Sequence, residues 1–357
     1  MKLRVLEWLR GAAALSVAMA HAHAMIGGNP ALPFPRWHAW SFPGTAGVEF
    51  FFVLSGFVMG VAHGAQLWRG GSVPSFLWRR CRRIYPLFWV MLAVPVYRFW
   101  GAPSVTPGSI TAWASLLPVR TDNLLVVAWT LRQEMTFYLM LALCLLPRIG
   151  PLVLASWVLA TVTHWFILPL PVPAGLAVPA SHVLSLFNFE FFAGLAAGLL
   201  FRRVPLGAGL GGGLLAAGVA LVAWRMAQDG WGAEYGPVSA RPLYGLGYAA
   251  ILLGAATLER RDVLRFGPVG TRFALAAGAL SYPLYLSHLL TLDAVAEVIG
   301  PAGLAARLGP GMTFALLLAG AVLGAALVAV LIDRPLQRVL QWLSAGSRSK
   351  RPMPEAA

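Results

Sequence analysis

Residues 311–332 read GMTFALLLAGAVLGAALVAVLI, which is 22 residues without one ionisable side chain. A membrane helix needs about 20 largely apolar residues to cross a hydrocarbon core of about 30 Å. This stretch is therefore long enough to span a bilayer. Nine further apolar stretches of similar length precede it, and proline and glycine cluster between them. They lie near 5–26, 44–63, 84–101, 124–146, 150–170, 183–201, 206–226, 240–258 and 273–293.

The composition of the whole chain agrees with a membrane protein. Of its 357 residues, 59% are hydrophobic and only 11% are charged, against about 25% charged in an average soluble domain. A soluble globule needs more polar surface, so a soluble enzyme, a disordered chain and a disulfide scaffold are excluded. We expect an all-α integral membrane protein. A bundle of about ten transmembrane helices should occupy residues 1–341, and a short polar cytoplasmic tail without fixed structure should follow at 342–357.

The net charge of +14 is explained by where the 27 lysines and arginines stand. If the N-terminus is cytoplasmic, 20 of the 27 fall on inside segments. Basic residues near span ends set orientation, so this split predicts that both termini are cytoplasmic. The positive charge then faces the anionic lipid of the bilayer, and nucleic-acid binding is not expected.

The first predicted span carries an arginine and a histidine on one face. Ionisable side chains in hydrocarbon are costly and by default mark a functional site or a buried pair. Arg10 and His21 are eleven residues apart, which is three helical turns plus about 20°, and about 16 Å in depth. His23 points to the opposite side. A histidine hydrogen-bonded between helices is the alternative for His21.

Two further spans carry a stripe of polar side chains on one helix face. The stripes are Thr130, Glu134 and Tyr138 on the fourth span, and Ser281, Tyr285 and His288 on the ninth. Glu134 and His288 have a predicted depth similar to that of His21. A neutral histidine near a buried carboxylate is equipment for general-base catalysis. Hydrogen bonding between helices, or a proton relay in a transporter, would use the same residues.

Four arginines within five residues stand directly before the predicted third span, namely Arg79, Arg80, Arg82 and Arg83. Guanidinium groups bind phosphates through paired hydrogen bonds, and orientation alone does not need so many. We therefore expect a phosphate-bearing ligand at the cytoplasmic surface, with a plain topology anchor as the alternative.

Other candidate residues support no assignment from sequence. Glu49, Arg132 and Glu190 could form internal ion pairs, whose partners the sequence does not identify. The remaining histidines lie near predicted interfaces and form no constellation; they are His38, His63, His164 and His182. Because no metal-ligand spacing, nucleophile elbow or phosphate-binding loop occurs, we expect neither a metal nor a tightly bound cofactor.

Six blocks, in order along the chain, resemble the motifs of the acyltransferase 3 family of bacterial membrane O-acyltransferases. The first block resembles the family's first-span motif, in which an arginine is followed, after ten intervening residues, by a histidine. The third block resembles the family's RRxxR motif. At position 49 the chain has glutamate where the family often has aspartate. The six blocks are Leu6–Ala13 with His21, Gly47–Phe57, Arg79–Pro86, Trp129–Tyr138, Ser281–His288 and Asp333–Pro335.

The resemblance implies about ten spans in the bacterial inner membrane. It also implies acyl-CoA, usually acetyl-CoA, as co-substrate and a hydroxyl acceptor, commonly a sugar of a surface glycan. His21 would be a general base or a transient acyl carrier. A transporter and a non-catalytic scaffold are the competing functions. The expected site residues are His21 and Glu134 as catalytic groups, Arg10, Arg79, Arg80 and Arg83 for acyl-CoA, and Glu49, Ser281, Tyr285 and His288 in the substrate cavity.

Overall fold

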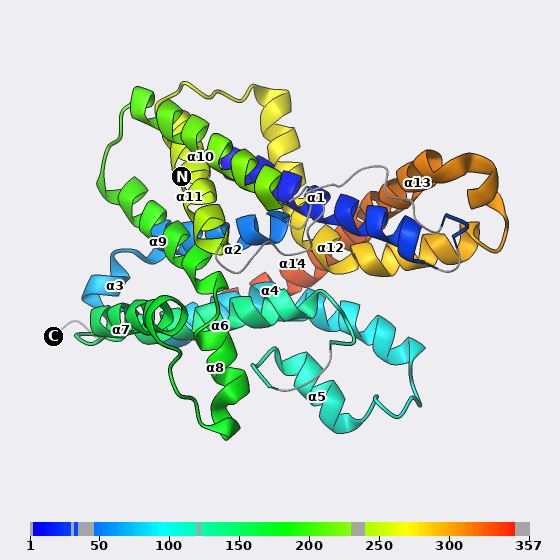
Figure 1. Cartoon of the computed structure of the whole chain (residues 1–357), viewed down its shortest axis with the longest axis horizontal. Helices are drawn as coiled ribbons and strands as arrows, with labels where there is room; N and C mark the ends of the chain where they lie inside the picture. Colours follow the sequence, from blue (N-terminus) through cyan, green and yellow to red (C-terminus); the bar gives the residue numbers. More distant parts are fainter. Residues whose placement is uncertain (1–2, 30–31, 35–45, 120–122, 230–239, 347–357) are drawn as a thin grey trace.

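A computed structural model describes residues 3–29, 32–34, 46–119, 123–229 and 240–346, which are almost entirely helical and include no strand. Figure 1 shows the arrangement of the helices. Three short helices, α3 (Gln66–Arg69), α5 (Pro107–Ser115) and α8 (Ala177–Val183), connect longer ones. The longer helices are α1 (Arg4–Gly28), α2 (Ala46–His63), α4 (Val73–Arg98), α6 (Ala128–Cys144), α7 (Gly150–Val162), α9 (Phe187–Arg203), α10 (Ala208–Asp229), α11 (Arg241–Arg260), α12 (Pro268–Ile299), α13 (Leu304–Val328) and α14 (Arg334–Gly346).

Every stretch predicted to span the membrane coincides with one of these helices, so the all-helical membrane fold is confirmed. Many of the polar side chains of the sites described below belong to α1, α4, α6 and α11. Neighbouring helices can shield such side chains from lipid. The number of ten spans and the sidedness of the termini remain predictions. Six helical segments in the described part of the chain are long and apolar enough to cross a bilayer: Ala46–His63, Gly150–Ile167, Ala174–Arg203, Ala208–Gln228, Pro268–Ile299 and Leu304–Leu343.

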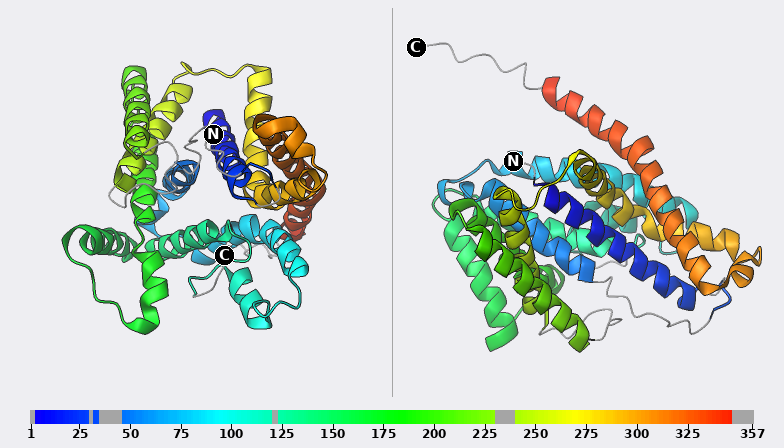
Figure 2. Two further views of the ribbon diagram at one scale, coloured as in Figure 1. Left: turned by 45° about the vertical axis from the view of Figure 1, so that its right-hand side comes forward. Right: turned by 90° about the horizontal axis from the view of Figure 1, so that it is seen from above.

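The C-terminal helix extends further than the sequence analysis predicts. The right-hand view of Figure 2 shows α13 continuing through a π-helical turn into α14, which projects beyond its neighbours. Because α14 ends at Gly346, the first five residues of the expected 342–357 tail are helical. Residues 347–357 lie outside the described part of the chain.

The arginine cluster, which the sequence analysis placed directly before the third span, lies within the same helix as that span. α4 begins at Val73, so the cluster occupies its second and third turns. Pro74 in the first turn is compatible with a helix start, because its missing N–H would have no partner there. The helix fixes the direction in which each of the four arginines leaves the helix axis.

α2 and α9 approach so closely that glycine is required where they meet. An added Cβ at Gly56 or Gly60 would collide with the backbone of α9. In the same way, a Cβ at Gly194 or Gly198 would collide with the backbone of α2. Helices surrounded by lipid gain little from the hydrophobic effect, so close packing through small residues supplies the contact energy.

α10 and α11 meet through a second set of glycines. An added Cβ at Gly218 would lie 2.6 Å from the carbonyl oxygen of Gly247, and one at Gly254 would lie 2.6 Å from that of Gly211. α11 also packs against α9 and α2. We therefore call α2, α9, α10 and α11 the glycine-packed side of the molecule.

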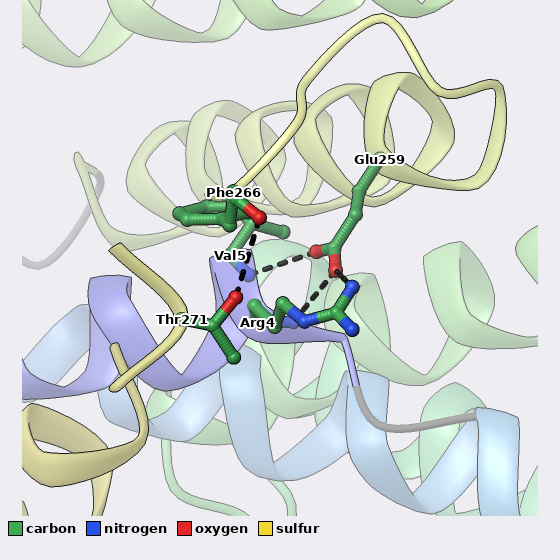
Figure 3. A network of polar contacts seen from close by, with 5 residues as sticks. All are labelled: Arg4, Val5, Glu259, Phe266 and Thr271. Carbon is green, nitrogen blue, oxygen red and sulfur yellow. Dashed lines mark hydrogen bonds and ion pairs between the residues drawn. The ribbon is translucent and has the colours of Figure 1, made fainter. Parts of the chain in front are cut away.

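The N-terminus of α1 is capped by a side chain from α11 (Figure 3). Leu3, at the N-cap position, supplies no side-chain hydrogen bond. Instead, the Glu259 carboxylate accepts from the backbone N–H groups of Arg4 at 2.9 Å and Val5 at 2.8 Å. The first N–H groups of a helix lack partners within the helix, and the helix dipole favours a negative charge there. Glu259 therefore fixes the first helix against the eleventh.

α1 runs along α12 and α13, as Figures 1 and 2 both show. The contact with α12 is again close, since an added Cβ at Gly11 would lie 2.6 Å from the Cβ of Ala277. Pro283 is accommodated inside α12, which continues to Ile299. This packing places the polar faces of α1 and α12 opposite those of α4 and α6.

Candidate active site

A cavity of about 370 Å³ lies among α1, α2, α4, α6 and α12. This volume is within the range of sites for small molecules and cofactors. Apolar side chains form much of the wall, and a few polar groups converge on it. We call α1, α4, α6 and α12, together with the face of α2 that is turned toward them, the cavity side. The polar lining residues are Glu7, Arg10, Ser55, Arg80, Arg83, Thr130, Glu134, Tyr138, Ser281, Tyr282 and Tyr285.

Three guanidinium groups line this cavity. Arg80 and Arg83 are three residues apart on α4 and share a helix face, and Arg10 joins them from α1. Arg79 instead donates to Ser75 Oγ at 2.9 Å on the exposed side of α4. The structure thus brings together three of the four arginines predicted to bind acyl-CoA and leaves Arg79 outside the cavity lining.

Arg10 is held in place by α12 and by its own helix. Its Nε donates to Ser281 Oγ at 2.8 Å, and Nη2 donates to the carbonyl oxygen of Gly278. Nη2 also lies 3.1 Å from a carboxylate oxygen of Glu7, one turn earlier on α1. Ser281, predicted as a substrate residue, lines the cavity and anchors this guanidinium.

Glu134 lies on the cavity wall and accepts two hydrogen bonds on one oxygen. Ser55 Oγ donates to Glu134 Oε1 at 2.9 Å, and Tyr138 Oη donates to the same oxygen at 2.6 Å. The predicted stripe on α6 is therefore on the wall, with Thr130, Glu134 and Tyr138 all lining the cavity. Ser55 was not identified from the sequence, which contains no signal that pairs it with α6.

The two ends of the cavity differ in charge. Thr130 and Tyr138 are eight residues apart on α6, which is about 12 Å along the helix axis. The Arg80 guanidinium lies 5.6 Å from the centre of the Tyr138 ring at one end. At the other end, Tyr285 Oη lies 2.5 Å from Thr130 Oγ1. Because Thr130 donates its own proton to the carbonyl of Val127, Tyr285 is the donor in this contact.

A pair of histidines lies directly behind Tyr285. The ring of His288 is 6.0 Å from that of Tyr285 and 5.0 Å from that of His21. His288 is fully buried, His21 is partly buried, and neither lines the cavity itself. The rings of Tyr285 and Phe51, 5.8 Å apart, both line this end of the cavity.

The contacts of the two histidines define their tautomers. His288 Nδ1 lies 3.0 Å from the carbonyl oxygen of Leu284, and His21 Nδ1 lies 2.9 Å from that of Val17. A carbonyl only accepts, so both Nδ1 atoms carry the proton. His288 Nε2, 3.3 Å from His21 Nδ1, therefore accepts from it. In a neutral His21 ring, Nε2 keeps a lone pair that can take a proton.

The structure separates two residues that the sequence analysis joined. Glu134 contacts Ser55 and Tyr138, whereas His21 contacts His288. The residue beside His21 is thus His288, whereas the sequence analysis paired His21 with Glu134. The sequence places these residues only by depth, and depth does not reveal which helix faces are in contact.

Glu49 does not lie in the cavity, where the sequence analysis placed it. Its carboxylate is buried and lies 3.1 Å from the guanidinium of Arg241 on α11, with Glu190 adjacent. Glu49 and Ser55 are six residues apart, which turns their side chains about 240° apart around α2. Ser55 faces the cavity, and Glu49 faces the glycine-packed side.

Comparison with known proteins identifies the family of this chain. The acyltransferase 3 family model, described as an acyltransferase domain, matches residues 3–331, a region that includes every residue of the cavity lining. The "Exopolysaccharide production protein ExoZ" of Rhizobium meliloti is 30% identical over 318 residues, 83% of this chain and 90% of that protein. "Protein 2 in picA locus" of Rhizobium radiobacter is 35% identical over 91 residues, 25% of this chain and 42% of that protein. No solved structure gives a significant match. The chain therefore belongs to the acyltransferase 3 family.

Proposed function

We propose that this protein is an O-acyltransferase of the bacterial inner membrane. It moves an acyl group, in the simplest case acetyl, from acyl-CoA to a hydroxyl group of a polysaccharide. Family membership supports acyl transfer, and the name of the Rhizobium meliloti relative supports a carbohydrate acceptor. Ten spans with both termini in the cytoplasm, and no tightly bound cofactor, are part of the proposal.

The observation that carries the proposal is the polarity of the cavity. One end holds the guanidinium group of Arg80 beside Tyr138, and the other end lies at Tyr285, next to the histidine pair. Arg83 and Arg10 line the same cavity. CoA has the matching polarity, with phosphates at one end and an uncharged arm that ends in the thioester. The arginines would hold the phosphates, and the arm would extend past Glu134 toward Tyr285.

The chemistry at the far end follows from the free nitrogen of His21. Nε2 takes the proton of the acceptor hydroxyl while that oxygen attacks the thioester carbonyl carbon. The new C–O ester bond forms, the C–S bond breaks, and the CoA sulfur receives the proton from His21. Nε2 of His288 accepts a hydrogen bond from Nδ1 of His21 and so stabilises the imidazolium. Transfer through an acyl-histidine is the variant mechanism. The hydroxyl of Tyr285 can donate to the oxyanion after leaving Thr130.

The test is acyl transfer by the purified full-length chain in phospholipid vesicles. With acetyl-CoA and a bacterial exopolysaccharide, we expect release of free CoA thiol and an equal gain of ester-linked acetyl groups on the glycan. A transporter or a scaffold would consume no thioester. Intact acetyl-CoA in the presence of a panel of polysaccharides would contradict the proposal.

Sealed vesicles test on which side each substrate binds. Acetyl-CoA is supplied on the face that carries the inner end of α4, and the glycan is supplied on the opposite face. Transfer without leakage of CoA would support a route through the protein, along the faces of α1, α6 and α12. Transfer only when both substrates share one face would contradict that route and favour a cytosolic or lipid-linked acceptor.

A further inference from the structure

His63, which the sequence analysis left without a function, lies beside the donor site. It is the last residue of α2, only 6% exposed, and its ring meets the edge of Phe76 at 5.0 Å. Phe76 is one turn before Arg80 on α4. The end of α2 and the start of α4 therefore bring an imidazole against one of the cavity arginines.

The contacts of His63 assign a donor and an acceptor nitrogen. Nδ1 lies 2.7 Å from the side-chain oxygen of Gln66 on α3, which only accepts, so Nδ1 carries the proton. In the neutral ring, Nε2 then has a lone pair. Nε2 lies 3.4 Å from Nη2 of Arg80, and a guanidinium only donates. Gln66 thus orients His63, and His63 accepts a hydrogen bond from Arg80.

The other neighbours of Arg80 hold its plane without neutralising its charge. The guanidinium carbon lies 5.6 Å from the ring centres of both Phe76 and Tyr138. The Nε atom is buried and has no hydrogen-bond partner among the described residues. A carboxylate in place of His63 would also hold Arg80, but it would cancel the charge that a phosphate must meet. A neutral imidazole fixes the side chain and leaves its full positive charge for a ligand.

We infer that His63 is a positioning residue for the donor site, which through Nε2 holds Arg80 in the direction that receives the phosphates of acyl-CoA. The inference rests on the proposed function. His63 touches neither the acceptor nor the reacting atoms, so its loss acts on donor binding and not on the acyl-transfer step. A protonated His63 would lose its acceptor nitrogen and place a second positive charge beside Arg80.

The test compares three substitutions at this position in the full-length protein in vesicles. His63→Gln keeps an acceptor oxygen near the position of Nε2, His63→Asn places it near Nδ1, and His63→Phe keeps the ring without an acceptor. We expect KM for acetyl-CoA to rise about tenfold in the Phe and Asn variants, with kcat at saturating donor within about twofold of wild type. The Gln variant should restore most of the donor affinity.

Arg80→Gln in the same assay separates this inference from the proposed function. If Arg80→Gln leaves the KM for acetyl-CoA unchanged, the donor site itself is wrong. If Arg80→Gln raises KM but His63→Phe and His63→Asn match wild type, the inference about His63 is overturned. Should both His63 variants fail to fold, Gln66→Leu provides the measurement, because it leaves His63 in place without its fixed tautomer. An unchanged KM in that variant would also count against the inference.

Discussion

The two faces of α2 show two ways of holding a membrane protein together. Gly56 and Gly60 bring its backbone against α9, where no side chain fits between the helices. Ser55 and its neighbours face a cavity of about 370 Å³, across which polar side chains bond to one another. Backbone contact provides stability on the glycine-packed side, and open space on the cavity side is available for substrate. Substitutions on the glycine-packed side should therefore lower stability, and substitutions on the cavity side should lower activity or substrate binding.

The largest effect is expected where the backbones touch. Gly56→Leu puts a side chain where even a Cβ collides with α9, and the backbone there cannot retreat. We expect a loss of about 3 kcal/mol or more in the free energy of unfolding, seen as loss of folded protein in detergent. Gly212→Leu on α10 is the matched control, since nothing lies within 4 Å of an added Cβ there. If the two variants are equally stable, close backbone contact is not what stabilises the glycine-packed side.

On the cavity side, the largest effect is expected at the proposed base. His21→Ala removes the nitrogen that accepts the proton and should lower kcat about a thousandfold while the protein stays folded. His23→Ala, two residues along the same helix, should keep most of the activity. Equal loss in both, measured as glycan acetylation at matched protein levels, would refute the assignment.

A smaller effect is expected at the arginine end. Arg83→Gln should weaken binding of acetyl-CoA about thirtyfold, because one charge-assisted contact to phosphate is lost. Arg79→Gln should change it much less, since Arg79 bonds to Ser75 outside the cavity lining. Direct titration with acetyl-CoA at low and high salt measures the dissociation constant of each variant. Added salt should weaken binding to the wild-type protein. Equal losses in the two variants would favour a general electrostatic patch over a shaped site.

The smallest of these effects is expected at His288. His288→Leu removes the acceptor for His21 Nδ1 but leaves the Val17 carbonyl to hold the tautomer. We expect kcat to fall about tenfold with KM for acetyl-CoA unchanged, and His288→Gln to recover part of it. A rise in KM without a fall in kcat would place His288 in the donor site and remove it from the histidine pair.

Periodicity alone predicts which residues share a helix face. The spacing of Thr130, Glu134 and Tyr138 places all three on one face of α6, and the structure has all three on the cavity wall. The apolar stretches likewise predict the helices, because hydrocarbon requires internally bonded backbones of sufficient length. Five of the six motif blocks that resemble the family lie within the matched residues 3–331, and Asp333–Pro335 follows just after them; the membership is confirmed.

Partners between helices could not be predicted, because they depend on how the helices rotate and pack. Glu49 pairs with Arg241, 192 residues away, and Glu134 binds Ser55, 79 residues away. No feature of the sequence around these residues indicates either pair. His63 illustrates the same limit, since its contact with Gln66 follows from spacing but its contact with Arg80 depends on the packing of α4. The glycines of α2 and α9 were visible in the sequence, but which helices they join was not.

The Glu259 cap has a consequence for the order in which the chain can assemble. The carboxylate that completes the start of α1 belongs to a residue 255 positions later than Arg4. At about 5–20 residues per second, a ribosome needs on the order of 10–50 s to make the intervening chain. Throughout that time the first N–H groups of α1 lack the carboxylate that caps them in the folded protein. Arg10 and His21, although among the first residues to emerge, meet their partners Ser281 and His288 only after α12 has been synthesised.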